Sequence, residues 1–319
     1  MILKPPIAPS EKDLLVAAIR SGKEEAVTRI LKIPNISVDT PDGSGTTPLI
    51  CAAQEDNLPA LRLLLSTNAV NVNHIIDREY AFTPATALGY AACNCNIAMA
   101  RLLLDAGALD ISSGQTEMAL MICLRKHFSG RRPMEQVAAD RKEITNLLLS
   151  RARPDVNATN AYGSTALHEA NTPEVVEAII SRGFRDVNAR TSSGITPLFH
   201  ATADVARVLL DHGADQSIAN EHGDTPLCNA VRSHKFETAE ILLAGSNCPV
   251  SVPNENGRTP LYWALRNGNE QIARKLFAAG ARIGLDELDT NHFRWGSEVG
   301  RDKILQILEE FPVMKSSPL

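Results

Sequence analysis

Three polar side chains, Glu169, His200 and Asn229, occupy one recurring position of a repeated string, four residues after a threonine. A carboxylate, an imidazole and an amide that converge could transfer a proton or bind a small polar ligand. The alternative is that the position is simply open to water. Buried polar groups need partners, so we expect these three to bond to one another, to water or to a ligand. The other copies of the string have less polar residues here: Cys51, Tyr90, Leu120 and Trp263.

No second motif supports catalysis. The sequence has no phosphate loop, nucleophile elbow, kinase signature or zinc motif. Its six cysteines form no CxxC pair, and the spacing of Cys93 and Cys95 is too weak to indicate a metal site. We therefore predict no cofactor, no bound metal and no catalytic residue, with Glu169 and His200 as the weak alternative. Whether the chain is an enzyme stays open at this point, and a non-enzyme is favoured.

Composition excludes other classes of protein. The chain has 319 residues, 44% of them hydrophobic, and a formal net charge of −5. Mild acidity and few aromatic residues provide neither the phosphate track nor the stacking platforms of a nucleic-acid binder. No apolar run of about 18 residues is present, so no membrane insertion is expected. The first ten residues do not resemble a secretory signal, so reduced cysteines and a cytoplasmic or nuclear location are expected.

One string recurs along the chain and determines the expected architecture. Asx-x-x-Gly, which is typical of turns, precedes four of its threonines, and Thr-Pro is typical of a helix N-cap followed by proline at the first helical position. A second apolar run ending in glycine follows several copies and predicts an outer helix with a C-cap. The clearest copies are TTPLICAA (46–53), TALGYAA (86–92), STALHEA (164–170), ITPLFHA (195–201), DTPLCNA (224–230) and RTPLYWA (258–264).

This string resembles the ankyrin repeat, which has a period of roughly 33 residues and a T-P-L-H-x-A core. The resemblance covers about residues 12–311. It implies an all-α fold, an ankyrin-repeat α-solenoid of helix-turn-helix units joined by β-hairpin-like loops, with about seven repeats and capping helix pairs at both ends. The repeats are numbered one to seven by their anchor threonines: Thr47, Thr86, Thr116, Thr165, Thr196, Thr225 and Thr259.

The expected domain organisation is a flexible N-terminus (1–10), a single solenoid (11–311) and a flexible tail (312–319). Degenerate copies at 13–31 and from 291 onward are expected to form the caps, because an uncovered terminal repeat would expose its apolar face. The third repeat is about 16 residues longer than the period, which places an insertion at about 127–142. We interpret it as a tolerated surface loop or as a binding loop.

Repeats four and five are short. Thr165 and Val175 are 10 residues apart, and Thr196 and Val205 are 9 apart, where the family pattern has about 13. Each has lost about one helical turn, which we expect between the inner and the outer helix. Thr172 supplies a new cap, so the outer helix of repeat four should survive. The result would be a notch in the middle of the groove, beside the three polar side chains.

The resemblance implies a non-enzymatic protein–protein interaction module or scaffold that binds a partner protein through its concave groove. The alternative function is a small-molecule-binding or catalytic protein that uses the notch at Glu169, His200 and Asn229. Hairpin tips and exposed ends of inner helices would contact the partner. The expected binding residues are Tyr162, Ser193, Glu221, His222, Asp224, Arg232, Ser233, Glu255, Asn256, Arg258, Arg266 and Asn267.

Arg232 and Arg266 occupy the same position one repeat apart, with Arg258 nearby. Arginine is favoured at binding hot spots and pairs bidentately with carboxylates, so a partner with an acidic segment across repeats six and seven is predicted. No nucleic-acid partner is expected, and the chain is expected to be a monomer. Ion pairs inside the protein are the alternative to an acidic partner, and the carboxylates that could form them are Glu221, Asp224 and Glu255.

Two further positions are expected to be structural. The resemblance implies that His168, at the T-x-L-H position, bonds to neighbouring backbone. Trp263 and Trp295 occupy equivalent sites in neighbouring units, and we interpret them as a packed pair rather than a binding cage.

Overall fold

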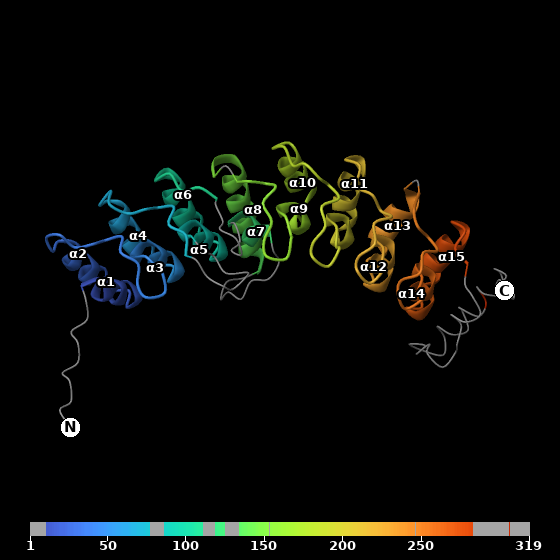
Figure 1. Cartoon of the computed structure of the whole chain (residues 1–319), viewed down its shortest axis with the longest axis horizontal. Helices are drawn as coiled ribbons and strands as arrows, with labels where there is room; N and C mark the ends of the chain where they lie inside the picture. Colours follow the sequence, from blue (N-terminus) through green and yellow to red (C-terminus); the bar gives the residue numbers. More distant parts are fainter. Residues whose placement is uncertain are drawn as a thin grey trace, which may run out of the picture. The chain divides into compact units, whose positions relative to one another are not determined.

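The computed structural model describes residues 11–76, 86–110, 119–124, 134–152, 154–245 and 247–282, together with residue 306. Contacts divide the chain into two compact units, Met1–Ala161 and Tyr162–Leu319. Every regular element in the described ranges is helical (Figure 1). The flexible ends predicted at 1–10 and 312–319 and the C-terminal cap predicted from 291 onward lie outside these ranges, residue 306 excepted.

The first unit consists of helix pairs that stack in order. Within each pair the two helices contact each other, and each also contacts its counterpart in the next pair, so inner and outer helices form two layers. The first pair confirms the N-terminal cap predicted at 13–31. The pairs are α1 (Glu11–Arg20) with α2 (Glu24–Leu31), α3 (Pro48–Gln54) with α4 (Leu58–Leu65), α5 (Ala87–Cys93) with α6 (Ile97–Asp105), and α7 (Ala119–Leu124) with α8 (Met134–Arg151).

The second unit repeats this arrangement. Its inner elements contact one another in sequence, and so do its outer helices. Figure 1 shows α12 and α14 on one side of this unit, with α13 and α15 on the other. The pairs are α9 (Ala166–Glu169) with α10 (Pro173–Ile180), the 3-10 helix η1 (Pro197–His200) with α11 (Ala203–Asp211), α12 (Pro226–Arg232) with α13 (Phe236–Ala244), and α14 (Pro260–Arg266) with α15 (Glu270–Ala278).

Anchor threonines start the inner helices, as their Thr-Pro pattern predicts. The hydroxyl of Thr225 accepts the N–H of Cys228 at 3.2 Å, and the hydroxyl of Thr259 accepts the N–H of Tyr262 at 3.2 Å. Each threonine is in extended conformation, and proline follows it at the first helical position. A capped first turn satisfies an otherwise unpaired N–H and fixes where the helix begins.

Leucine and alanine build the interior. In the described repeats other than the third, a leucine two residues after the anchor is buried, as at Leu49, Leu227 and Leu261, where no surface is exposed. Burying one leucine side chain contributes about 2 kcal/mol. The alanines that follow, such as Ala52 and Ala53, are also fully buried and let neighbouring helices approach closely. This core holds the helix ends and tips in a fixed register.

The shortening of repeats four and five is confirmed, but its predicted place is wrong. The inner elements α9 and η1 have 4 residues each, whereas α12 and α14 have 7. The connection from α9 to α10, residues 170–172, is as long as the connection 233–235 in a full-length repeat. The missing turn therefore belongs to the inner helix itself. Thr172 caps α10 as predicted, accepting the N–H of Val175 at 3.4 Å.

Part of the insertion predicted at 127–142 is helix rather than loop. Helix α8 has 18 residues and begins at Met134, whereas α6 in the preceding repeat has 9. Residues 134–142 therefore extend the outer helix of repeat three at its N-terminal end. Interpretation as a loop is wrong for this part, and residues 127–133 lie outside the described ranges.

Candidate functional site

Two tips in the second unit are turns held by one asparagine side chain each, and in the tip at 191–194 the Oγ1 atom of Thr191 accepts the N–H of Ile195 at 3.1 Å instead. The Oδ1 atom of Asn220 accepts the N–H of His222 at 3.0 Å and the N–H of Asp224 at 2.9 Å. Asn254 makes the same two bonds in the next repeat. The predicted turn chemistry of Asx-x-x-Gly is therefore confirmed here.

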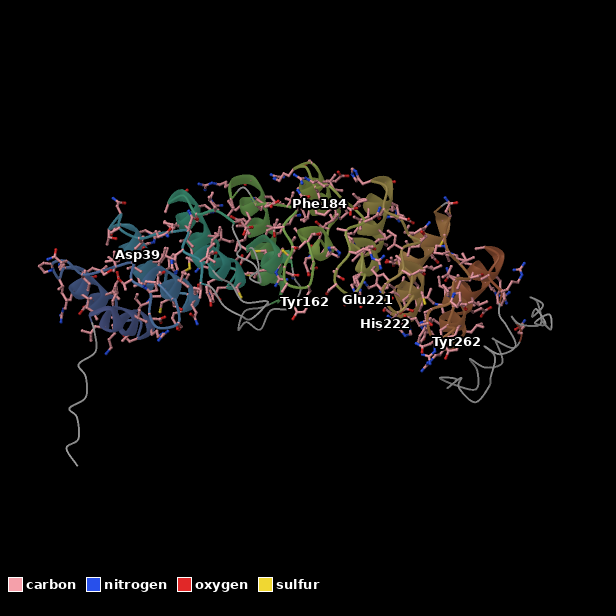
Figure 2. The ribbon with its side chains drawn as sticks, in the orientation of Figure 1. Asp39, Tyr162, Phe184, Glu221, His222 and Tyr262 are labelled. Atoms are coloured by element: carbon pink, nitrogen blue, oxygen red, sulfur yellow. The ribbon has the colours of Figure 1, made fainter. Side chains whose placement is uncertain are left out.

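Neighbouring tips also bond to each other, so their side chains form a fixed row. Gly223 has φ +74°, and a Cβ atom there would lie 3.1 Å from the backbone of the next tip. In Figure 2, Tyr162, Glu221 and His222 lie along one edge of the unit, with Phe184 at the opposite edge. The tip-to-tip bonds run from Ser192 N–H to Tyr162 O (2.8 Å), from Glu221 N–H to Ser193 O (3.1 Å) and from Glu255 N–H to His222 O (3.0 Å).

Most predicted tip residues are exposed. Among the described tips, a carboxylate contact between His222 Nδ1 and Glu255 Oε2 is loose, at 3.9 Å. Because this contact is loose, the side chains of His222 and Glu255 can turn toward another molecule. The exposed predicted residues are Tyr162, Ser193, Glu221, His222, Ser233, Glu255 and Asn256.

Asp224 is an exception, and its predicted contact with a partner is wrong. Its side chain is 2% exposed. One carboxylate oxygen, Oδ2, accepts Arg232 Nη1 at 2.6 Å, while Oδ1 accepts Asn254 Nδ2 at 2.8 Å and the thiol of Cys228 at 3.4 Å. Burial and the nearby Asp224 raise the pKa of Cys228 to about 12, so the thiol stays protonated and donates. The alternative of internal neutralisation is confirmed for Asp224 and Arg232.

Asn267 also serves the protein interior. Its Nδ2 atom donates to Val231 O at 2.9 Å, one repeat earlier. Asn94 makes the equivalent bond to Ala53 O at 2.9 Å in the first unit. The amide at this position ties one inner helix to the next and is not free for a partner.

Three arginines surround one indole. The guanidinium carbons of Arg232, Arg258 and Arg266 lie 5.8, 5.4 and 5.3 Å from the centroid of the Trp263 ring. The ring of Tyr262 packs edge-on against Trp263, with 5.3 Å between centroids. Arg232 is the last residue of α12, and Arg266 is the last residue of α14. Arg258 lies at the end of the tip, directly before the anchor Thr259. The spacing of the repeats therefore brings the three arginines together. We call these four residues, Arg232, Arg258, Arg266 and Trp263, the arginine–tryptophan cluster.

Charges in this cluster are not balanced. Asp224 neutralises Arg232. Among the described residues, the guanidinium of Arg258 has no carboxylate partner, and that of Arg266 bonds only to the Tyr262 hydroxyl, at 3.4 Å. Arginine does not lose its proton in proteins. Within the described part of the chain, two positive charges beside Trp263 therefore have no carboxylate that compensates them.

Asn229 bridges two inner elements instead of facing an open notch. It is 3% exposed. Its Nδ2 atom donates to Phe199 O at 2.8 Å, and its Oδ1 atom accepts Arg232 Nη2 at 3.0 Å. The amide that was a candidate for ligand binding is therefore used within the protein. It also fixes the position of Arg232.

Glu169 and His200 lie on the two shortened elements, α9 and η1. Glu169 Oε1 accepts the hydroxyl of Ser164 at 3.4 Å. The imidazole of His200 is exposed on one side and packs edge-on against Phe199. Partial burial and then the positive charge of Lys235 lower its pKa, although Glu169 acts in the opposite direction. His200 is therefore a neutral imidazole at neutral pH.

Replacing Asn229 with alanine should lower the free energy of unfolding by about 1.5 kcal/mol, because it leaves a buried carbonyl without its donor. Chemical denaturation followed by circular dichroism measures this change. Ser233→Ala is the matched control, since its exposed hydroxyl makes only a 3.5 Å contact with Asn229. Equal stability of the two variants would show that the bridge to Phe199 contributes nothing.

His168 has the structural role that the resemblance implies. Its Nδ1 atom accepts the N–H of Thr165 at 3.1 Å, and its Nε2 atom donates to Ile195 O at 3.1 Å. Burial lowers its pKa, so the imidazole stays neutral and can both accept and donate. It links the start of α9 to the next repeat.

The described part of the chain contains no cluster of three or more His, Cys, Asp or Glu side chains placed to hold a metal ion. None of its helices combines the length and apolar character needed to cross a bilayer. Trp295, the predicted partner of Trp263, lies outside the described residues.

Comparison with known proteins points to one family. A family model described as ankyrin repeats (3 copies) matches residues 14–115, 134–220 and 204–287. The chain is also similar to the solved structure of the ankyrin repeat domain of Bcl-3, described as a unique member of the IkappaB protein family. That similarity has 26% sequence identity and a TM-score of 0.49, and covers 72% of this chain and 97% of the other.

Proposed function

This chain belongs to the ankyrin-repeat family, and from that premise we propose that it is a non-enzymatic module whose second unit binds a partner protein carrying an acidic segment. Ankyrin-repeat domains generally mediate protein–protein interaction. The observation that carries the finer proposal is the pair of uncompensated guanidiniums, Arg258 and Arg266, beside Trp263. Arginine and tryptophan are the residue types most enriched at binding hot spots.

The partner would lie along the tips and the inner-helix ends that wall the family's concave groove. The row of bonded tips supports this, because a rigid surface loses little conformational entropy on binding. Of the residues predicted from the sequence, Asp224, Arg232 and Asn267 act inside the protein. Those we assign to the partner are Tyr162, Ser193, Glu221, His222, Ser233, Glu255, Asn256, Arg258 and Arg266.

We further propose that the protein acts as a monomer in the cytoplasm or the nucleus. All six cysteines are free thiols, and four of them are buried. Free thiols persist in compartments where disulfides are reduced. Buried thiols also carry raised pKa values, as at Cys51 (about 11, through burial), which makes them slow to oxidise.

A pull-down with charge-reversed protein tests the proposed function. We expect Arg258→Glu/Arg266→Glu to retain at least about tenfold less partner protein than the wild type does, because the new glutamates repel the acidic segment of the partner. Arg207→Glu/Arg274→Glu is the matched control, with the same charge change on outer helices. Arg232 is left intact, since a carboxylate there would repel the buried Asp224.

The measurement is quantitative mass spectrometry of retained proteins, followed by titration of the purified partner. Melting curves establish that all three proteins are folded. If wild type, variant and control retain the same proteins to the same extent, the two arginines do not bind the partner and the proposal is wrong.

A further inference from the structure

The arginine–tryptophan cluster places three guanidinium groups around one indole ring. Three guanidinium carbons lie within 5.3 to 5.8 Å of one ring centroid. The single described counter-charge, Asp224, is saturated, because Arg232 takes Oδ2 and Asn254 takes Oδ1. A ligand that neutralises what remains must supply two negative charges.

The two remaining guanidiniums are held in place without using most of their donors. Arg258 packs over both Tyr262 and Trp263, at 5.5 and 5.4 Å from the ring centroids. Arg266 packs over Trp263, and the Tyr262 hydroxyl fixes one of its nitrogens. Cation–π contacts engage the flat face of a guanidinium, so its N–H edge stays available for an anion.

The number of charges and donors distinguishes between anions. A phosphorylated side chain carries a charge of about −1.5 to −2 at neutral pH and three acceptor oxygens, so it can pair with two arginines at once. One carboxylate carries a single charge and would leave one guanidinium unpaired. Both arginines are partly buried, and the lower local dielectric strengthens the preference for full neutralisation.

An extended polyanion fits this surface less well than a single phosphate. The exposed carboxylates of Glu221 and Glu255 lie on adjacent tips, and Glu255 belongs to the same turn as Arg258. They would repel the neighbouring phosphates of a nucleic acid. A single phosphate on an otherwise uncharged peptide avoids this repulsion.

We propose that the arginine–tryptophan cluster binds a phosphoserine or phosphothreonine side chain of the partner protein. This inference rests on the proposed function, and it replaces a general acidic segment with one dianionic group. Arg258 and Arg266 bind the phosphate oxygens. Arg232, whose charge is paired with Asp224 and whose position is fixed by Asn229, lies at the edge of the site.

The first test uses three immobilised peptide libraries that differ only at a fixed central residue: phosphothreonine, glutamate or threonine. We expect the full chain to bind the phosphothreonine library at least about tenfold better than the other two. Arg258→Gln/Arg266→Gln should lose this preference, while the matched pair Arg207→Gln/Arg274→Gln keeps it. Arg258→Lys/Arg266→Lys should bind with intermediate strength, because lysine keeps the charge but not the bidentate geometry.

The second test measures binding at the cluster itself through the fluorescence of Trp263. The chain has 2 tryptophans, so Trp295→Phe leaves Trp263 as the single indole emitter. Titration with the retained phosphothreonine peptides should change its fluorescence saturably. The same titration of Trp295→Phe/Arg258→Gln/Arg266→Gln should produce no change.

Each remaining outcome overturns the inference. Equal binding of the glutamate library would assign the site to carboxylates. Binding of the phosphothreonine library that survives the double arginine variant would place the phosphate elsewhere. No binding of any library by folded protein, or stronger binding of a single-stranded oligonucleotide, would also contradict it.

The two proposals can fail separately. In the lysate pull-down, prior phosphatase treatment should abolish retention of the partner. If phosphatase has no effect but Arg258→Glu/Arg266→Glu still loses the partner, the acidic-partner proposal stands and the phosphate inference is wrong. If the charge reversal has no effect, both are wrong.

Discussion

Replacing Asp224 with alanine is expected to lower the free energy of unfolding by about 3 kcal/mol, because it removes the acceptor of a charged donor and of a buried amide together. The lost bonds are those from Arg232 Nη1 at 2.6 Å and from Asn254 Nδ2 at 2.8 Å. Arg232 is 38% exposed and can turn to water. The Asn254 amide is buried and cannot.

The effect should extend to the next tip. Asn254 Oδ1 accepts the N–H of Asn256 and of Arg258, so an unpaired Asn254 side chain loosens the turn that positions Arg258. Guanidinium denaturation followed by circular dichroism gives the change in stability. Glu221→Ala is the matched control, since this exposed carboxylate lies in the same turn, and it should change the free energy of unfolding by less than about 0.5 kcal/mol. A loss of stability no larger than that of the control would mean that the Asp224 network does not stabilise the fold.

The local features of the fold were predictable because each acts within a few residues. Thr-Pro places a cap and the first turn of a helix side by side in the sequence, and Asx-x-x-Gly closes a turn within the same four positions. Thr172 was recognisable as the start of α10 for this reason. The spacing of anchors also gave the number of residues missing from repeats four and five.

Spacing did not tell which part of a repeat lost its turn. The connections 170–172 and 201–202 are already close to the shortest that join two antiparallel helices. The loss therefore falls on the inner helix, and α9 and η1 have 4 residues each. The insertion could not be assigned from spacing either. Nothing in the local sequence of residues 134–142 distinguishes a loop from an extension of α8.

The candidate site depended on long-range contacts and was predicted only in part. Asp224 stands directly before its anchor threonine, where residues of the other described repeats are buried or half-buried, and its carboxylate bonds to Asn254, 30 residues later. Trp263 was expected to pack against Trp295, and its contacts with three arginines were missed. A usable signal was present, because three arginines in two consecutive repeats flank the largest side chain at that position.

Stability should also depend on pH through Asp110, a carboxylate buried at the start of α7. It is 3% exposed and accepts the N–H of Ala119 at 2.6 Å and of Leu120 at 2.9 Å. Burial raises its pKa from 3.8 to about 7, and these two bonds offset only part of that effect. Asp110 thus caps α7 and is close to half-protonated at neutral pH.

The direction of the pH effect follows from this raised pKa. The native state binds the Asp110 proton more tightly than the unfolded state does, so the stabilisation is complete below about pH 4 and is lost as pH rises through about 7. A rise of the pKa from 3.8 to about 7 corresponds to roughly 4 kcal/mol. The neighbouring thiol of Cys123 has a pKa raised well above its usual value by burial, so it does not titrate in this range.

Asp110→Asn isolates the effect, because asparagine does not titrate and its amide can accept only one of the two N–H groups. We expect this variant to be less stable than the wild type at pH 4, and the difference should shrink or reverse by pH 8, changing by about 3 to 4 kcal/mol. Urea denaturation at several pH values measures both proteins. Asp105→Asn, which alters an exposed carboxylate paired with Arg151, should follow the wild-type profile. Parallel profiles for wild type and Asp110→Asn would show that Asp110 is ionised throughout, with its two backbone bonds outweighing burial.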